Sequence, residues 1–263
     1  MLVLSPQDWL LGIMGLVSGL LAGLLGIGGG TILVPGLVML HYTPIQAVAT
    51  SNLAIAITAL SGSLQNWRSG HLDWRLVLTL GLPALFTAQL GVVYSNQMSP
   101  PILMTAFGFF LLANGLLVWW RDRLERQERA FVLSLSPPLA KLLTGGAAGF
   151  LAGLFGVGGG VIMIPLQRVL LAEPIKKAIQ TSLGVIVLTA IAALVGQGLR
   201  GNVLINVGLE LGLGGLVGAQ ISTRCLPRLP ASVVTVCFYS FLLVLALYTF
   251  RQAWVLSSSP APV

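Results

Sequence analysis

The sequence contains very little charge and very few cysteine or histidine residues. Only 8% of its 263 residues are charged, and it has two cysteines and two histidines, whereas soluble domains carry roughly 25% charged residues. Cys225 and Cys237 provide neither a disulfide framework nor a cluster of metal ligands. We therefore expect no separate soluble domain, no metal site and no cofactor.

The sequence is rich in hydrophobic residues. They make up 56% of the chain, and the mean hydropathy is +0.94. A helix needs about 20 apolar residues to span a bilayer. Eight apolar runs approach or exceed this length: Trp9–Leu40, Pro44–Trp67, Leu76–Tyr94, Pro100–Trp120, Leu142–Leu171, Ala178–Leu199, Val203–Thr223 and Leu229–Phe250. We therefore expect an all-α integral membrane protein that crosses the cell membrane (an inner or plasma membrane) several times, surrounded by membrane lipids.

The basic residues lie between the apolar runs. The net charge is +7, but nucleic-acid-binding proteins gather Lys and Arg on one solvated face. Here the basic residues are spread over the connections, so we interpret them as topology signals and expect no nucleic-acid partner.

Two stretches of the chain resemble each other at an offset of 130 residues. Gly15–Pro35 reads GLVSGLLAGLLGIGGGTILVP, and Gly145–Pro165 reads GGAAGFLAGLFGVGGGVIMIP. After one inserted residue the matches continue at an offset of 131, as far as Ala88-Gln89 and Ala219-Gln220. We therefore expect two homologous transmembrane repeats, 1–120 and 142–256, joined by a charged cytoplasmic linker at 121–141 and followed by a disordered tail at 257–263.

Both stretches are interrupted by the same glycine sequence, Gly28–Gly30 in the first and Gly158–Gly160 in the second. Glycine permits φ > 0 and close backbone approach, so we expect each helix to break and a new arm to start near Gly30 and Gly160. The free N–H groups and the positive dipole at such a start form an anion site. The alternative is that these glycines only let helices pack closely. The earlier glycines of each stretch are interpreted as packing glycines: Gly15, Gly19, Gly23, Gly145, Gly149 and Gly153.

A nucleotide-binding interpretation of the glycines fails. A dinucleotide fingerprint follows a strand and has an acidic residue about 20 positions later. In this chain a long apolar run precedes the glycines, and no Asp or Glu lies between Trp9 and Gly70.

The positions of the charges favour one topology. If every apolar run crosses once, the 14 basic residues divide 9 to 5 between the two sides. If the glycine-broken run of each repeat enters the membrane and returns, they divide 12 to 2, which fits the positive-inside rule far better. The second arrangement gives each repeat three full crossings, inverts one repeat relative to the other and places both termini outside. Broken helices at equivalent places in inverted repeats indicate a transporter site near the middle of the membrane.

The duplicated pattern Ala-Gly-x-x-Gly-x-Gly-Gly-Gly…Pro, with Ala-x-x-Thr-Ser beyond each proline, resembles the sulfite exporter TauE/SafE family of membrane permeases. The first copy occupies Ala22–Pro35 and Ala47–Ser51, and the second occupies Ala152–Pro165 and Ala178–Ser182. The resemblance covers Gly12–Phe250. It implies transport of small anions, often sulfur oxyanions and sulfonates, without ATP hydrolysis.

Polar residues near the breaks are candidate contacts of the anion. They are Thr50, Ser51 and Asn52 in the first repeat, and Thr181 and Ser182 in the second. We expect them to start the helix after each broken element, where they either cap that helix, bond to a neighbouring helix, or contact the substrate. The second repeat has Leu183 where the first has Asn52, so the site is not fully symmetric.

Further polar side chains lie inside the apolar runs. The amides of Gln65, Asn66, Gln89, Gln197 and Gln220 are interpreted as hydrogen-bonding links between helices.

Glu210 is the only carboxylate well inside an apolar run. Intramembrane acids mark functional sites by default, and proton coupling is the sharper hypothesis for this residue. The alternative is a structural ion pair with Arg200 or another basic residue.

The sequence thus predicts a secondary transporter that moves a small anion, such as sulfite, another sulfur oxyanion or an organosulfonate, by alternating access. The candidate binding residues are Gly28, Gly29, Gly30, Thr50, Ser51, Asn52, Gly158, Gly159, Gly160, Thr181 and Ser182, with Glu210 for proton coupling. The alternatives are a non-transporting membrane subunit or assembly factor, a channel, and an intramembrane enzyme, for which the sequence provides no catalytic set. The identity of the anion, the direction, the coupling ion and a homo-oligomeric state stay open.

Overall fold

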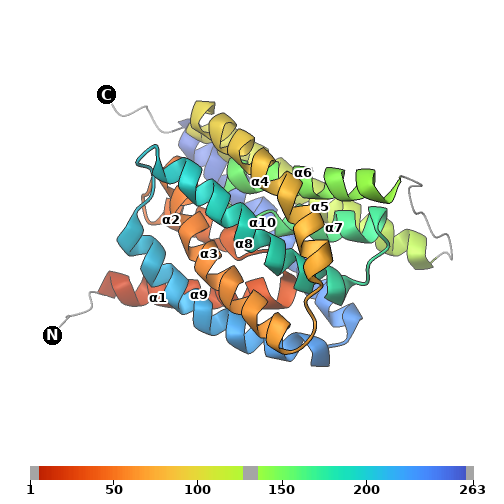
Figure 1. Cartoon of the computed structure of the whole chain (residues 1–263). Coiled ribbons are helices and arrows are strands. Elements are labelled where there is room, and N and C mark those ends of the chain that lie inside the picture. The colour runs from red at the N-terminus through yellow and green to blue at the C-terminus, as the bar shows by residue number, and fades with distance from the viewer. Residues whose placement is uncertain (1–5, 127–135, 259–263) are drawn as a thin grey trace.

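The computed structural model describes residues 6–126 and 136–258, and in these ranges the chain forms helices and no strand, as expected. We call these ranges the first and the second half. The first half contains α1 (Pro6–Leu25), α2 (Gly30–Met39), α3 (Pro44–Arg68), α4 (Trp74–Gln97) and α5 (Pro100–Arg126). The second contains α6 (Pro137–Phe155), α7 (Gly160–Leu170), α8 (Ile175–Gly198), α9 (Ile205–Cys225), the short 3-10 helix η1 (Leu226–Arg228) and α10 (Ala231–Ser258) (Figure 1).

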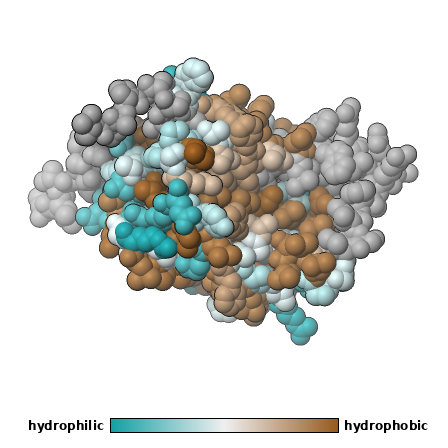
Figure 2. All heavy atoms as spheres, turned by 90° about the horizontal axis from the view of Figure 1, so that it is seen from above, coloured by the Kyte–Doolittle hydropathy of each residue, from teal (hydrophilic) through white to brown (hydrophobic). Residues whose placement is uncertain are grey.

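Four helices in the described ranges are long and apolar enough to cross a membrane, namely α3, α4, α6 and α8. Shorter apolar stretches follow in α1, α2, α5 and α7. Figure 2 shows hydrophobic atoms across the middle of one face of the molecule, with hydrophilic residues gathered mainly toward one end. The helices α3 and α8 have the largest buried share and lie at the centre, so the chain has the build of an integral membrane protein.

The helices extend into the expected linker and tail. Helix α5 continues to Arg126, and α6 already begins at Pro137. Residues 127–135 of the expected linker lie outside the described residues, as do 259–263 of the expected tail.

The structure corrects the expected start of α3. Thr43 caps this helix: its hydroxyl accepts a hydrogen bond from the Gln46 N–H, and the Gln46 side chain accepts one from the Thr43 N–H. Pro44 follows at a position that favours proline. The expectation that Thr50 and Ser51 start the helix is therefore wrong, and these residues lie inside it. Helix α8 likewise begins at Ile175, so Thr181 and Ser182 are also internal.

The chain reverses direction at each glycine break. In the first half, the Ser18 hydroxyl donates to the Gly29 carbonyl at 3.1 Å, and a Cβ on Gly36 would lie 2.6 Å from the Met14 sulfur. Moving along α2 therefore leads back toward the start of α1, and the two helices form an antiparallel hairpin. In the second half, Gly159 lies in the same way against Ala148 of α6.

Connections of both halves meet at each end of the molecule. At one end, Lys177 Nζ lies 3.8 Å from Asp73 Oδ2, and Lys176 donates to the Pro227 carbonyl at 2.9 Å. At the other end, the Asn202 side chain donates to Asn96 Oδ1 at 2.8 Å. The start of α1 and the end of α10 also lie toward this second end (Figure 1). An arrangement in which both termini lie toward the same end is the one that divides the basic residues 12 to 2 between the two sides. The orientation of the two ends in the membrane stays a prediction.

Glycines let α1 lie directly against α9, and α6 against α4. A Cβ on Gly15 or Gly19 would overlap a carbonyl oxygen of α9, and a Cβ on Gly149 would overlap the Ala84 carbonyl oxygen of α4. The packing interpretation of these glycines is confirmed.

Two of the intramembrane amides link helices at matched places. Gln89 donates to the Ala192 carbonyl and joins α4 to α8, while Gln220 donates to the Ser61 carbonyl at 3.0 Å and joins α9 to α3. The interpretation of these two amides as links between helices is confirmed.

Helix α6 offers a matched pair of glycines that tests the packing. Gly149→Ala should lower the stability by about 1–3 kcal/mol, because the methyl group forces α6 away from α4. Gly146→Ala should leave it unchanged or raise it slightly, since its Cβ would meet only Thr87 Cγ2 at 3.7 Å and alanine favours helix. Melting temperatures in detergent measure both, and equal values for the two variants would contradict the close contact.

Candidate functional site

The two glycine breaks have nearly identical backbone geometry. Gly26, Gly28 and Gly29 have φ angles of 65°, 74° and 80°. The corresponding glycines of the second half, at 156, 158 and 159, have 65°, 74° and 79°. Residues with a side chain rarely adopt these left-handed angles, which explains why glycine occupies all six positions. The predicted arms start where expected, α2 at Gly30 and α7 at Gly160.

The two glycine turns, residues 26–30 and 156–160, lie against each other. A Cβ on Gly30 would lie 2.8 Å from Val157 Cα and would overlap the Gly156 carbonyl oxygen. A Cβ on Gly160 would overlap the Gly26 carbonyl oxygen. All ten residues of the turns are buried. The turns therefore meet backbone to backbone in the interior of the protein, although they are far apart in the sequence.

Two of the predicted site residues hold the turns crosswise. The Ser51 hydroxyl, in the first half, donates to the Gly156 carbonyl of the second half at 2.8 Å. The Ser182 hydroxyl, in the second half, donates to the Gly26 carbonyl of the first half at 2.9 Å. Of the roles left open for these serines, bonding to a neighbouring element is the one that the structure shows.

Two further hydroxyls bond to the turns, and the sequence analysis did not identify them. Ser18 donates to the Gly29 carbonyl, and Thr189 donates to the Gly158 carbonyl at 3.0 Å. Ser and Thr in apolar helices commonly bond to carbonyl groups of their own helix. The sequence therefore gives no sign that Ser18 and Thr189 bond to another part of the chain. Their role becomes visible only when the turns are placed beside them.

Four carbonyl groups of the turns thus accept side-chain hydrogen bonds, and the N–H groups of Gly26 and Gly156 donate to the Ala22 and Ala152 carbonyls. The N–H groups further along each turn, at the helix starts, differ from these. The first N–H groups of a helix have no partner within it, and the N-caps of α2 and α7, Gly29 and Gly159, provide no side-chain cap. Both helix starts also carry the positive end of the helix dipole. The arrangement favours a small anion and uses no charged side chain of the turns.

The remaining candidate residues divide into two kinds. The Thr50 hydroxyl accepts a hydrogen bond from the Leu204 N–H at 3.1 Å, so Thr50 holds the start of α9. Asn52 Oδ1 and the Thr181 hydroxyl are buried and have no protein partner within the described part of the chain. The same is true of Thr31 in the first turn of α2, which the sequence analysis missed. Buried polar atoms of this kind are suited to bind a ligand or water.

Two isoleucines fill the space beside the turns. A Cβ on Gly28 would lie 3.4 Å from Ile55 Cγ2 and 3.3 Å from Ile186 Cγ2, and Gly158 approaches the same two side chains. Both isoleucines are fully buried. Two cavities of about 390 and 360 Å³ lie elsewhere, and no residue of the glycine turns lines either of them. We call this arrangement, in which buried side chains cover the turns, the closed conformation.

Glu210 lies away from the turns. It lines the cavity of about 360 Å³ together with Trp9 and other residues of α1 and α9. Further along α9, Ser222 donates to the Gly19 carbonyl of α1 at 3.2 Å. Ser222 lies twelve residues beyond Glu210, and twelve residues of helix measure about 18 Å. Glu210 therefore lies beside the start of α1, while the glycine turn lies at its end. Arg200, the suggested ion-pair partner, donates to the Gly196 carbonyl at 2.7 Å.

The described residues contain no cluster of three or more His, Cys, Asp or Glu side chains that could hold a metal ion. The chemistry of the site thus rests on backbone groups, hydroxyls and one amide.

The chain is similar to one known protein family and to several relatives. The family model described as "Sulfite exporter TauE/SafE" matches residues 11–249. A probable membrane transporter protein of Methanocaldococcus jannaschii is 33% identical over 194 residues, which cover 71% of this chain and 70% of the relative. Probable membrane transporter proteins of Bacillus subtilis and Xylella fastidiosa are each 27% identical, over 81% and 91% of this chain and 87% and 93% of their own lengths.

The crossed serines provide a stability test. Ser51→Ala or Ser182→Ala leaves a buried carbonyl without its donor, which should lower the free energy of unfolding by about 1–3 kcal/mol. Thr79→Ala is the control, because the Thr79 hydroxyl bonds only within α4, and we expect a change within about 0.5 kcal/mol. Thermal unfolding in detergent measures all three, and unchanged stability in both serine variants would show that the crossed bonds do not hold the turns.

Proposed function

Since the chain belongs to the sulfite exporter TauE/SafE family, we propose that it is a permease for a small anion such as sulfite, another sulfur oxyanion or an organosulfonate. That it is a membrane transporter follows from the family and from its apolar helices. The class of substrate is inferred from the site. The observation that carries it is the pair of buried glycine turns, whose two helix starts point partial positive charge into the protein interior.

The proposed binding residues follow from the unoccupied groups. The backbone N–H groups of Gly28–Gly30 and Gly158–Gly160 would bind the oxygens of the anion. Asn52, Thr181 and Thr31 would add side-chain contacts, because their buried polar atoms have no partner in the described part of the chain. Ser51 and Ser182 would not contact the anion; they would position the turns through their hydrogen bonds to the Gly156 and Gly26 carbonyls. Binding through dipoles and hydroxyls needs no buried fixed charge, which is costly inside a membrane.

Transport would use the two halves as inverted repeats. The hairpins α1–α2 and α6–α7 enter from opposite ends, and their tips meet at the turns. In the closed conformation Ile55 and Ile186 cover the tips, so anion binding requires one hairpin to move relative to α3 or α8. Movement of one hairpin opens the site to one side, and movement of the other opens it to the opposite side.

The second candidate function, a non-transporting membrane subunit, differs in one measurable property. A permease should exchange anions as the purified chain alone, whereas a subunit needs its partner. Saturable counterflow in proteoliposomes also distinguishes a carrier from a channel.

Anion counterflow tests the proposed site directly. Gly29→Leu and Gly159→Leu should abolish exchange of sulfite, thiosulfate or small sulfonates, because the side chains would overlap Ser18 and Ala148 and the left-handed angles strain the turns. Gly198→Leu is the matched control: a Cβ there meets no atom within 4 Å, and exchange should persist. Wild-type exchange in either turn variant, at equal amounts of folded protein, would remove the site from the turns.

A pH gradient tests Glu210 separately. If this carboxylate couples transport to protons, Glu210→Gln should abolish the stimulation of uptake by a pH gradient while leaving counterflow exchange at equal pH unchanged. Stimulation equal to that of the wild type would assign Glu210 a structural role.

A further inference from the structure

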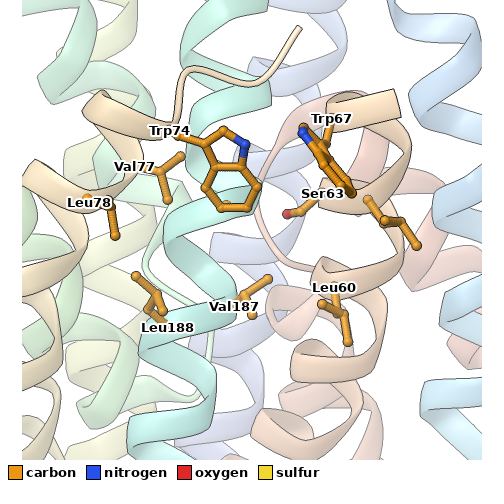
Figure 3. A pocket seen from close by; sticks show the side chains of 10 residues that line it. Leu60, Ser63, Trp67, Trp74, Val77, Leu78, Val187 and Leu188 are labelled. Atoms are coloured by element: carbon orange, nitrogen blue, oxygen red, sulfur yellow. The ribbon is translucent and has the colours of Figure 1, made fainter. Parts of the chain in front are cut away.

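A cavity of about 390 Å³ opens between α3, α4 and α8, apart from the glycine turns. Trp67 and Trp74 lie on its two sides in Figure 3. Their ring centroids are 6.3 Å apart, with the rings at 73° to each other. The volume lies within the range of about 300–1,000 Å³ that is typical of small-ligand sites.

The walls of the cavity are almost entirely apolar, and it opens sideways. At its mouth, Leu60 and Leu78 are 58% and 52% exposed. Deeper inside, Val77 is buried and packs against Gly184, where an added Cβ would lie 2.7 Å from Val77 Cγ2. The one polar side chain, Ser63, is 6% exposed, and its hydroxyl has no partner among the described residues. A cavity that opens between transmembrane helices faces the hydrocarbon of the bilayer rather than water.

The corresponding place, between α8, α9 and α3, has different side chains. At an offset of 131, Leu53 corresponds to Gly184 and Gly208 corresponds to Val77, so a close contact between a glycine and a larger side chain is present in both places with the partners exchanged. The counterparts of Trp67 and Trp74 are Gly198 and Ile205, which have no aromatic ring. The cavity, which α3 and α4 of the first half form with α8 of the second, therefore has an aromatic lining that its counterpart lacks.

Two positive charges accompany the tryptophans. Arg68 directly follows Trp67, Arg75 directly follows Trp74, and both arginines are exposed. Tryptophan side chains prefer the membrane interface, and nearby arginines attract the head groups of anionic lipids. Each of these features suits one part of a phospholipid. The apolar cavity suits an acyl chain, the interfacial aromatic pair suits the glycerol region, and the two exposed cations suit the phosphate.

We propose that this cavity binds one anionic phospholipid, with an acyl chain between α3, α4 and α8 and the phosphate group beside Arg68 and Arg75. The proposal depends on the protein being in a membrane and not on the transported anion. Gly184, in the depth of the cavity, lies two residues beyond Ser182, which bonds to the Gly26 turn. A bound lipid therefore contacts the segment of α8 that holds one of the glycine turns.

The test uses the full chain extracted in mild detergent from vesicles of phosphatidylglycerol and phosphatidylethanolamine, with native mass spectrometry of the retained lipid. Wild-type protein should retain one phosphatidylglycerol. Val187→Phe should lose it, because Val187 lines the cavity and the larger ring occupies the space of the acyl chain. Leu82→Phe is the matched control: Leu82 is 56% exposed on α4 and does not line the cavity, so the lipid should remain.

A second variant separates the head group from the acyl chain. Arg68→Gln combined with Arg75→Gln should reduce the preference for phosphatidylglycerol over phosphatidylethanolamine by about tenfold, because both charges near the phosphate are removed. Both side chains are exposed, so the fold should be unaffected. Arg224→Gln, an exposed cation on α9 outside the cavity, should change nothing.

Three results would overturn the proposal. The first is wild-type protein that retains no phospholipid, and the second is Val187→Phe that retains as much as Leu82→Phe. The third is an unchanged lipid preference in the double arginine variant. Because none of these measurements involves anion flux, they distinguish failure of the lipid site from failure of the proposed transport function.

Discussion

Backbone groups buried in a membrane protein must find hydrogen-bonding partners inside the protein or in a polar cavity, and the glycine turns meet this requirement only in part. Hydroxyls of Ser18, Ser51, Ser182 and Thr189 occupy carbonyl oxygens of the turns. The N–H groups at the starts of α2 and α7 receive no side-chain cap. The same set of bonds therefore stabilises the turns and leaves them with an excess of donors, which is the property that an anion site needs.

The two halves have similar helices but different side chains at the places where a ligand would discriminate between them. The first half has Thr31 and Asn52 where the second has Val161 and Leu183. It also supplies Trp67 and Trp74 to the cavity beside α8, where the second half has Gly198 and Ile205. The proposed side-chain contacts thus lie mainly in the first half, with Thr181 in the second, while both halves supply backbone groups. A site of this kind presents its side-chain contacts to an anion mainly from one side.

The sequence predicted those features that depend on glycine alone. The positions of the breaks, the starts of α2 and α7 and the close helix packing at Gly15 and Gly19 all follow from residues that lack a side chain, although the partner helix α9 was not predicted. The helix start at Pro44 was missed because the Thr43 cap was not weighed against the Thr-Ser pair further on. The partners of Ser51 and Ser182 could not be predicted, since they lie 105 and 156 residues away and depend on how the halves pack. Ile55 and Ile186 look like ordinary core residues until the turns are set beside them.

The crossed serine bonds also bear on how such a chain could have originated. Either half alone would have a serine without its acceptor and a turn without its donor, so each half completes the other. Two identical half-length subunits, packed in opposite directions, would exchange the same bonds by symmetry. Joining them into one chain would preserve every crossed contact and would allow the two copies to diverge, which is the kind of difference that Asn52 and Leu183 present. The reciprocity of two hydrogen bonds is thus compatible with descent from an antiparallel dimer by gene fusion.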